Sequence, residues 1–222
     1  HDALPIYAGA GPSLFLAHPA LLDTASKSRA VIIQVMSGRS CSNSAFEALD
    51  GRNRLRRRSD GQVMTDGPAY RWALETLVRD TCLQLVRESQ ARWLEEMIRL
   101  ADSIATRKIL FWFATRETAF EPEPRTFKTL MGEFPHLIST EMIAELTPMF
   151  DAVVKCVSTR GLPQPLHDRM TGKPAEVTFV GTARTENRYY PSPAMHLDAA
   201  MALAPHIVPA LGAADGSVRH HD

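Results

Sequence analysis

Short apolar runs alternate with stretches of helical periodicity along this chain. The clearest run, Arg29–Met36 (RAVIIQVM), is short, continuous and rich in β-branched residues, which is typical of a strand buried on both faces of a parallel sheet. Lys108–Ala114 (KILFWFA) and Asp151–Val157 (DAVVKCV) share this pattern. We therefore predict three central strands, with a further strand at Leu4–Ala8 and an edge strand at Glu176–Val180.

Helical patterns lie between these runs. Ser13–Ala25 is predicted to be helical, with Pro19 interrupting or restarting the helix. A long helical region is expected at 67–105, and another at 139–150 that starts on a Ser-Thr pair. The last helix is predicted to start near Pro193.

Strands that alternate with helices indicate βαβ units. The sequence therefore predicts one α/β domain at 1–211, with a three-layer, doubly wound, mostly parallel sheet of the flavodoxin-like kind. Residues 37–66 are expected to be irregular, and 212–222 are expected to form a flexible tail.

The chain has 222 residues, 45% of them hydrophobic, and a net charge of zero, which suits one full-sized core and argues against a general polyanion binder. Its three cysteines are far apart and form no CxxC pair, as expected for reduced thiols in a cytoplasmic protein. No apolar run approaches the roughly 18 residues of a membrane span. Because the N-terminus lacks both a Met and a signal pattern, we interpret the chain as a fragment that lacks a first strand, and expect further chain or a partner to cover the side of Arg29–Met36.

Ligands of parallel sheets bind beyond the carboxyl ends of the strands. Gly9 and Gly11 lie in such a loop, where their N–H groups suit an anion or oxyanion, although a plain tight turn explains them equally well. The loop after Arg29–Met36 offers Ser37, Gly38 and Asn43 as further candidates for an oxyanion or substrate site.

A serine of that loop, or Cys41, could act as a nucleophile beside a base, whereas the alternative is a polar turn whose side chains bond their own backbone. His196, in the first turn of the last helix, is a candidate general base, or else a packed histidine. No histidine spacing indicates a metal, and no cofactor is expected.

Five arginines within seven residues form an unusual basic segment in a neutral chain. Guanidinium groups suit bidentate binding of phosphate, sulfate or carboxylate, and the alternative is a solvated loop or an interface with acidic helices. Without interleaved aromatic residues, the segment does not indicate nucleic-acid binding. If it is ordered, we expect carboxylates such as Glu88, Glu95 or Glu96, or a bound anion, beside at least two of the arginines. The arginines are Arg52, Arg54, Arg56, Arg57 and Arg58.

The segments PIYAGAGPSLFLAHPALLDTA, VIIQVMSGRSCSN, LRRR and ARWLEEMIRLADSI…KILFWFA resemble an uncharacterised bacterial domain family, over about 4–211. Members of that family are similar to the SGNH (GDSL-like) hydrolases. That resemblance implies an SGNH-like fold in which Gly9 or Gly11 and Asn43 stabilise an oxyanion and His196 is the base. The chain departs from the SGNH pattern in three places: the first-strand block with the nucleophilic serine is absent, Ser40 stands where the asparagine is expected, and Pro193 replaces the aspartate before the histidine.

Two functions follow from these observations. The first is an SGNH-like hydrolase of an ester, such as an acyl or acetyl group on a carbohydrate, or an inactive relative of such an enzyme. In it Gly11, the loop at 37–43 and His196 converge on one rim of the sheet, and the serine lies upstream of His1. The second is an anion-binding or sulfotransferase-like, polysaccharide-modifying protein that uses the arginine segment. Neither function requires a nucleic acid or a membrane.

Overall fold

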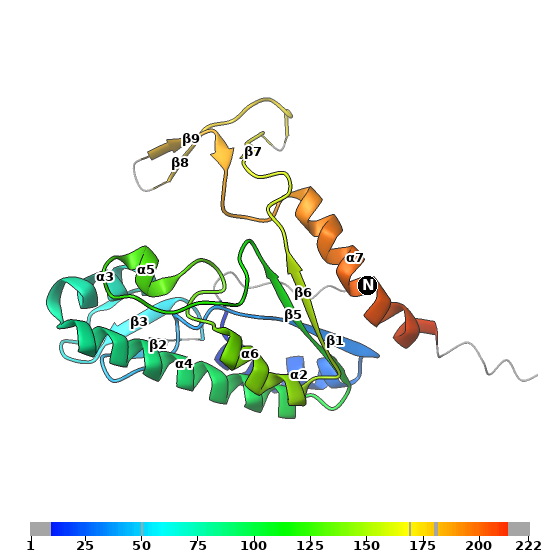
Figure 1. The fold of residues 1–222 in the computed structure, drawn as a ribbon, viewed down its shortest axis with the longest axis horizontal. Helices are drawn as coiled ribbons and strands as arrows, with labels where there is room; N and C mark the ends of the chain where they lie inside the picture. Colours follow the sequence, from blue (N-terminus) through cyan, green and yellow to red (C-terminus); the bar gives the residue numbers. More distant parts are fainter. Residues whose placement is uncertain (1–9, 50, 169, 180–181, 213–222) are drawn as a thin grey trace, which may run out of the picture.

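The computed structural model describes residues 10–49, 51–168, 170–179 and 182–212. The chain forms a mixed α/β structure around a three-strand parallel sheet, with smaller antiparallel sheets beside it (Figure 1). In chain order the elements are α1 (Pro12–Leu16), α2 (Pro19–Ser26), β1 (Ala30–Gln34), β2 (Phe46–Leu49), β3 (Arg54–Arg57), β4 (Val63–Thr65), α3 (Asp66–Thr76), α4 (Arg79–Asp102), β5 (Arg107–Ala114), α5 (Phe127–Met131), α6 (Thr140–Leu146), the 3₁₀ helix η1 (Thr147–Met149), β6 (Ala152–Val157), β7 (Gln164–Pro165), β8 (Val177–Phe179), β9 (Thr182–Arg184), β10 (Glu186–Asn187) and α7 (Pro193–Gly212).

The parallel sheet has the strand order β1-β5-β6, with β5 at its centre. Ala30 pairs with Arg107 at the start of β5, and Ile109 pairs with Ala152 of β6. All three central strands predicted from the apolar runs are confirmed. Within the described residues β1 pairs only with β5, and its Ile32 is 42% exposed.

Helices pack against both faces of this sheet. Leu110 and Trp112 of β5 join a core with α4 and α6, whereas the alternate residues Phe111 and Phe113 join a core with α7. Figure 1 shows α7 on one side of β5 and β6 and α4 with α6 on the other. The mixed α/β class and the parallel sheet are therefore confirmed. A sheet of three strands does not confirm the finer doubly wound, flavodoxin-like arrangement.

The segment 37–66 is not irregular, so that prediction is wrong. It contains the antiparallel sheet β2-β3-β4, in which Phe46 pairs with Arg57 and Leu55 pairs with Met64. Leu55 is fully buried and its neighbours on β3 are arginines, so the apolar-polar alternation of this strand rests on one residue. That is too short a pattern to recognise in sequence.

Val177–Phe179 is a strand, but not an edge strand of the parallel sheet as expected. It pairs with β9 in a small hairpin, within an arm that leaves the body between β6 and α7 (Figure 1). The arm is anchored where it returns, because the Ser192 hydroxyl donates to the Arg160 carbonyl at 2.5 Å. The predicted strand Leu4–Ala8 lies outside the described residues.

The predicted helices are confirmed, with two breaks. Pro19 starts α2 as a new helix after α1, as expected from its missing N–H. The long region 67–105 holds two helices, because Leu77 and Val78 are extended between α3 and α4. The last helix begins at Pro193, where it was predicted.

Candidate functional site

The loop that follows β1 packs against the segment between α5 and α6. The Gly38 N–H donates to the His136 carbonyl at 2.9 Å. A Cβ at Gly38 would lie 3.2 Å from Ile138, so the glycine permits this close approach. The predicted oxyanion donor at Gly38 is therefore bonded within the fold.

The glycine-rich segment before α1 is bonded in a similar way. The Gly11 N–H donates to the Gly51 carbonyl at 2.9 Å. Gly51 has a φ of +60°, and a Cβ there would clash with the Leu14 backbone. The turn between β2 and β3 therefore packs directly against α1. Gly9 lies outside the described residues.

Asn43 is buried and all of its polar atoms have partners. Its Nδ2 donates to the Tyr70 hydroxyl at 3.2 Å and to the Ser89 hydroxyl at 3.0 Å. Its Oδ1 accepts the N–H groups of Ala45 at 3.0 Å and Phe46 at 2.8 Å. Burial also raises the pKa of Tyr70, so the phenol stays neutral. The Asn43 amide thus holds the start of β2 against α3 and α4.

The hydroxyls and the thiol of the same loop are also constrained. The Ser40 hydroxyl donates to Asp66 at 3.0 Å, and the Arg39 Nε donates to the same oxygen at 2.7 Å. The Ser37 hydroxyl accepts from the Arg39 N–H at 3.5 Å. Cys41 is buried, and burial together with the charge of Glu96 raises its pKa, which disfavours the nucleophilic thiolate.

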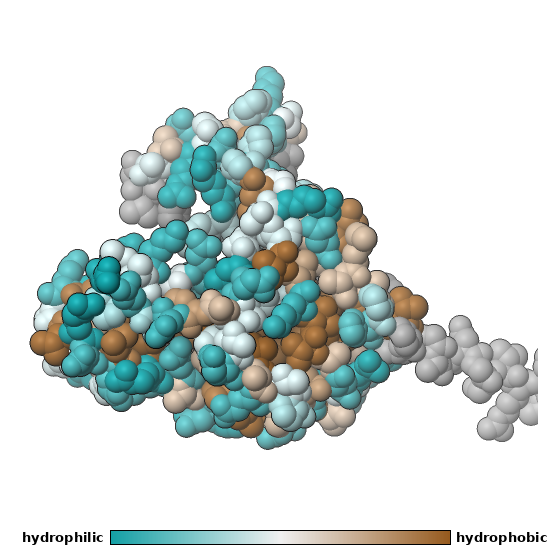
Figure 2. Space-filling model, in the orientation of Figure 1, coloured by the Kyte–Doolittle hydropathy of each residue, from teal (hydrophilic) through white to brown (hydrophobic). Residues whose placement is uncertain are grey.

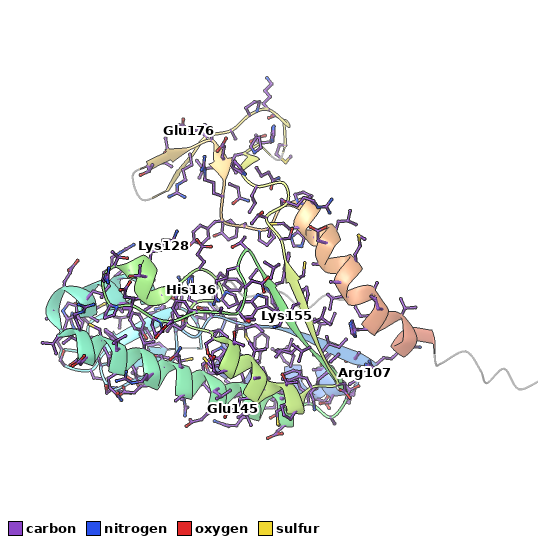
Figure 3. The ribbon with its side chains drawn as sticks, viewed as in Figure 1. Arg107, Lys128, His136, Glu145, Lys155 and Glu176 are labelled. Atoms are coloured by element: carbon purple, nitrogen blue, oxygen red, sulfur yellow. The ribbon has the colours of Figure 1, made fainter. Side chains whose placement is uncertain are left out.

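His136 lies beside this loop and was not singled out by its spacing in sequence. Its Nδ1 is 2.9 Å from the Gly132 carbonyl, so that nitrogen carries the proton in the neutral ring. Burial, followed by the positive charge of Arg39, lowers the pKa of His136 to about 4. Figure 3 shows His136 near the carboxyl end of the sheet, beside α5.

Arg116 holds the loop after β5 against the same segment. Its guanidinium donates to the carbonyls of Glu133 at 3.0 Å and Ile138 at 2.9 Å, and it lies over the Trp112 ring. Burial lowers the pKa of Arg116 to about 10, so it remains charged at neutral pH. This arginine therefore serves the fold, and it fixes the backbone to which Gly38 bonds.

His196 lies on the other face of the sheet. It is exposed in the first turn of α7, and its ring centroid is 5.6 Å from that of Phe113, near the carboxyl end of β5. Among the described residues, no hydrogen bond or ion pair joins His196 to the loop after β1. Its predicted convergence with Gly38 and Asn43 stays a prediction.

The arginine segment is ordered, and carboxylates lie beside two of its arginines. Arg56 pairs with Glu47 at 3.1 Å, and the Arg57 Nε donates to Asp60 at 2.9 Å. Arg57 lowers the pKa of Asp60 to about 2. The expectation of carboxylate partners is confirmed, but the partners differ from those named: Glu88 accepts from the Ser44 N–H, and Glu95 and Glu96 pair with Arg92.

The five arginines do not act as one cluster. Arg52, Arg54 and Arg56 are exposed, whereas Arg57 is half-buried, with its guanidinium 4.4 Å from the Trp72 ring centroid. Arg58 is exposed, and its Nε donates to the Asn43 carbonyl at 3.1 Å. No described residue bonds to its two Nη groups, so the N–H donors of these groups can bind a ligand.

Arg57 and Arg58 line a cavity of about 410 Å³ between β3, α3 and the start of α4. Hydroxyls and apolar side chains form the remaining walls. Neither Trp72 nor Asp60 was predicted from the sequence as a site residue. The lining residues are Ser44, Ala45, Arg57, Arg58, Ser59, Trp72, Leu77, Thr81 and Leu85.

A second cavity of about 630 Å³ lies at the loop after β5 and the start of α6, lined in part by Phe120, Glu121, Thr140 and Glu141. Within the described part of the chain, no group of three or more His, Cys, Asp or Glu side chains is arranged to hold a metal ion. No helix there is long and apolar enough to cross a membrane.

Residues 72–211 match the model of a domain-of-unknown-function family, DUF6473. The chain belongs to the DUF6473 family. No curated protein and no solved structure matches it. Membership of an uncharacterised domain family is therefore confirmed. DUF6473 carries no described activity, so the bacterial origin and the relation to SGNH hydrolases stay predictions.

The DUF6473 match divides the candidate site residues. His196 and the cavity residues of α3 and α4 lie inside it, whereas Arg57, Arg58 and the loop at 37–43 precede it. The arginine cavity is thus built partly from the DUF6473 region and partly from the β2-β3-β4 sheet.

Proposed function

We propose that this DUF6473 protein binds a small anionic ligand in the cavity lined by Arg57 and Arg58, which we call the arginine cavity. Arg58 is the observation that carries the proposal. Its Nε is fixed on the Asn43 carbonyl at 3.1 Å, and its two Nη groups have no bonding partner among the described residues. A guanidinium held in this way presents two parallel donors, which is the geometry that phosphate, sulfate and carboxylate accept.

The rest of the arginine cavity supports a ligand with both polar and apolar parts. The hydroxyls of Ser44, Ser59 and Thr81 can donate to anion oxygens or to a sugar. Ala45 and Leu77 add apolar wall that suits the C–H groups of a sugar, whereas one face of the Trp72 ring is covered by the Arg57 guanidinium. A sulfated, phosphorylated or carboxylated sugar is therefore the ligand class that we favour, and a polysaccharide-modifying role would follow from it.

The test is a titration of the protein with sulfate, phosphate and a sulfated sugar, read as thermal stabilisation, with sodium chloride at matched ionic strength as the control. A ligand present at about 100 times its Kd adds about 2.7 kcal/mol of stability, which corresponds to several degrees in Tm. Selective stabilisation by one of the three anions is expected. A Tm that follows ionic strength alone would overturn the proposal.

Ester hydrolysis is a second candidate, favoured by one observation: His196 is exposed beside Phe113, near the carboxyl end of β5. An SGNH-like enzyme would use His196 as base and an ester of a small molecule or carbohydrate as substrate. The donors expected at Gly11, Gly38 and Asn43 are bonded within the fold. This candidate therefore requires that these hydrogen bonds break before the same groups can bind an oxyanion. Three further expectations belong to this candidate, and we propose them with it: a doubly wound fold, a bacterial origin and a cytoplasmic location.

The hydrolase candidate is tested by His196→Ala with a chromogenic acetyl ester, and His167→Ala on the arm is the matched control. Removal of a general base should lower the rate by about 100-fold or more. An equal rate in both variants would exclude the assignment of His196 as base.

A further inference from the structure

Helix α7 has apolar side chains on two opposite faces. Its inner face packs on β5 and β6 through Met195, Ala199, Leu203 and Ile207. Three large apolar side chains on its outer face are exposed: Leu197 by 54%, Met201 by 67% and Val208 by 63%. Figure 2 shows apolar surface on the side of the molecule that α7 occupies. A helix that is apolar all round is usually covered on both sides.

The outer residues form a regular row along α7. Leu197, Met201, Ala204 and Val208, which we call the outer seam, are separated by four, three and four residues. At 3.6 residues per turn, this spacing places them within about 60° of one another around the helix. The alternation of three and four residues is the repeat by which two helices pack along a seam.

The outer seam is complementary to itself. Its 4-3-4 spacing reads the same in both directions, so a two-fold axis between positions 202 and 203 superposes it on an antiparallel copy. Leu197 then lies opposite Val208 of the second copy, and Met201 lies opposite Ala204 of the second copy. A large side chain faces a small one at the centre, which lets the helices approach closely.

The distribution of charge also favours a second copy of α7 as the partner of the outer seam. Residues beside the outer seam include Ala200 and Pro205, and the nearby Asp198 is paired with Arg160 at 2.5 Å. In helix pairs, charges beside the seam select the partner, and here no unpaired charge repels an identical helix. The chain as a whole has a net charge of zero at pH 7 with neutral histidines, so two copies do not repel one another.

We infer that α7 docks against α7 of a second copy through the outer seam, as an antiparallel pair. The seam covers about 18 Å of helix at 1.5 Å per residue, so the contact is small. The dimer is therefore weak and forms as the protein concentration rises. This inference does not depend on anion binding.

Sedimentation equilibrium over a concentration series tests the inference with Leu197→Glu/Met201→Glu. Val78→Glu is the matched control, because Val78 is 72% exposed and lies between α3 and α4, away from α7 (Figure 1). The parent and the control should dimerise with the same Kd, and the double variant should weaken dimerisation at least about tenfold. A parent that stays monomeric up to about 1 mM, or a dimer that the double variant leaves intact, would overturn it.

Cysteine cross-linking tests the orientation without adding charge. The native cysteines Cys41, Cys82 and Cys156 are all buried, which keeps the background low. A mixture of Leu197→Cys and Val208→Cys proteins should give the mixed disulfide dimer in large excess over either self-linked dimer. Predominant self-linked dimers, or no disulfide at concentrations where the parent dimerises, would contradict the antiparallel seam.

Discussion

The loop Ser37–Asn43 and the segment Arg54–Arg58 are equally polar in sequence, and the fold uses them differently. In the loop, the Gly38 N–H and the Asn43 amide are bonded to other parts of the chain. In the arginine segment, the backbone is satisfied by sheet pairing, and Arg58 keeps two Nη groups without described partners. Polar density alone therefore does not identify a binding site. A binding site is indicated by the hydrogen-bond donors that have no partner within the folded chain.

The largest expected effect concerns the stability of the loop. Asn43→Ala removes four hydrogen bonds and leaves the buried Phe46 N–H and the part-buried Ala45 N–H without their acceptor. Each unsatisfied buried group costs about 1–3 kcal/mol, so we expect a loss of about 3–4 kcal/mol in the free energy of unfolding, measured in urea.

Asn187→Ala is the matched control for this prediction. The Asn187 side chain bonds the backbone of Tyr189 and Tyr190 in the same way, but it lies in the exposed arm. We expect a loss below about 1 kcal/mol. Similar losses in the two variants would mean that the loop after β1 is not the more constrained of the two regions.

The next effect is a pH dependence at the loop. Burial lowers the pKa of His136 from its usual 6.5 to about 4, so the unfolded chain binds an additional proton between these values. Stability is therefore full above pH 6.5 and falls as the pH drops towards 4, by up to about 3 kcal/mol. His136→Gln should flatten this part of the curve of unfolding free energy against pH. An unchanged curve would assign the acid sensitivity to other groups.

The sequence predicted the elements that depend on long apolar patterns. The three parallel strands and the helix from Pro193 were recognised because their apolar residues form long, nearly continuous runs in the sequence. β3 was missed, because Leu55 is its one buried residue among arginines. Whether Asn43 binds a ligand or holds the fold depends on Tyr70 and Ser89, which are distant in sequence and have no pattern that connects them to it.

In the arginine cavity, Arg58→Ala should weaken sulfate or phosphate binding at least about tenfold, because it removes the paired donors. Arg56→Ala is the matched control. Arg56 lies two residues before Arg58, on β3, and carries the same charge, but it pairs with Glu47 and does not line the cavity. Calorimetric titration gives both affinities. An equal loss in the two variants would indicate diffuse charge rather than a site.

The smallest expected effect concerns Asp60. This carboxylate occupies the Arg57 guanidinium and thereby competes with an incoming anion. Asp60→Asn should raise the affinity for sulfate severalfold, because it weakens this competition. Asp23→Asn, in the exposed pair with Lys27, is the control for the change in net charge. Equal gains in both variants, or none in Asp60→Asn, would show that Asp60 does not control access to Arg57.

The most direct test of the account follows the arginine side chains by NMR while phosphate is added at constant ionic strength. The Nε–H signal of Arg58 should shift along a saturable curve, with a smaller shift at Arg57, and the signal of Arg56 should stay in place. Single substitutions to lysine assign the signals. Absent shifts, or equal and unsaturated shifts of all three arginines, would contradict the claim that the fold leaves Arg58 free to bind an anion.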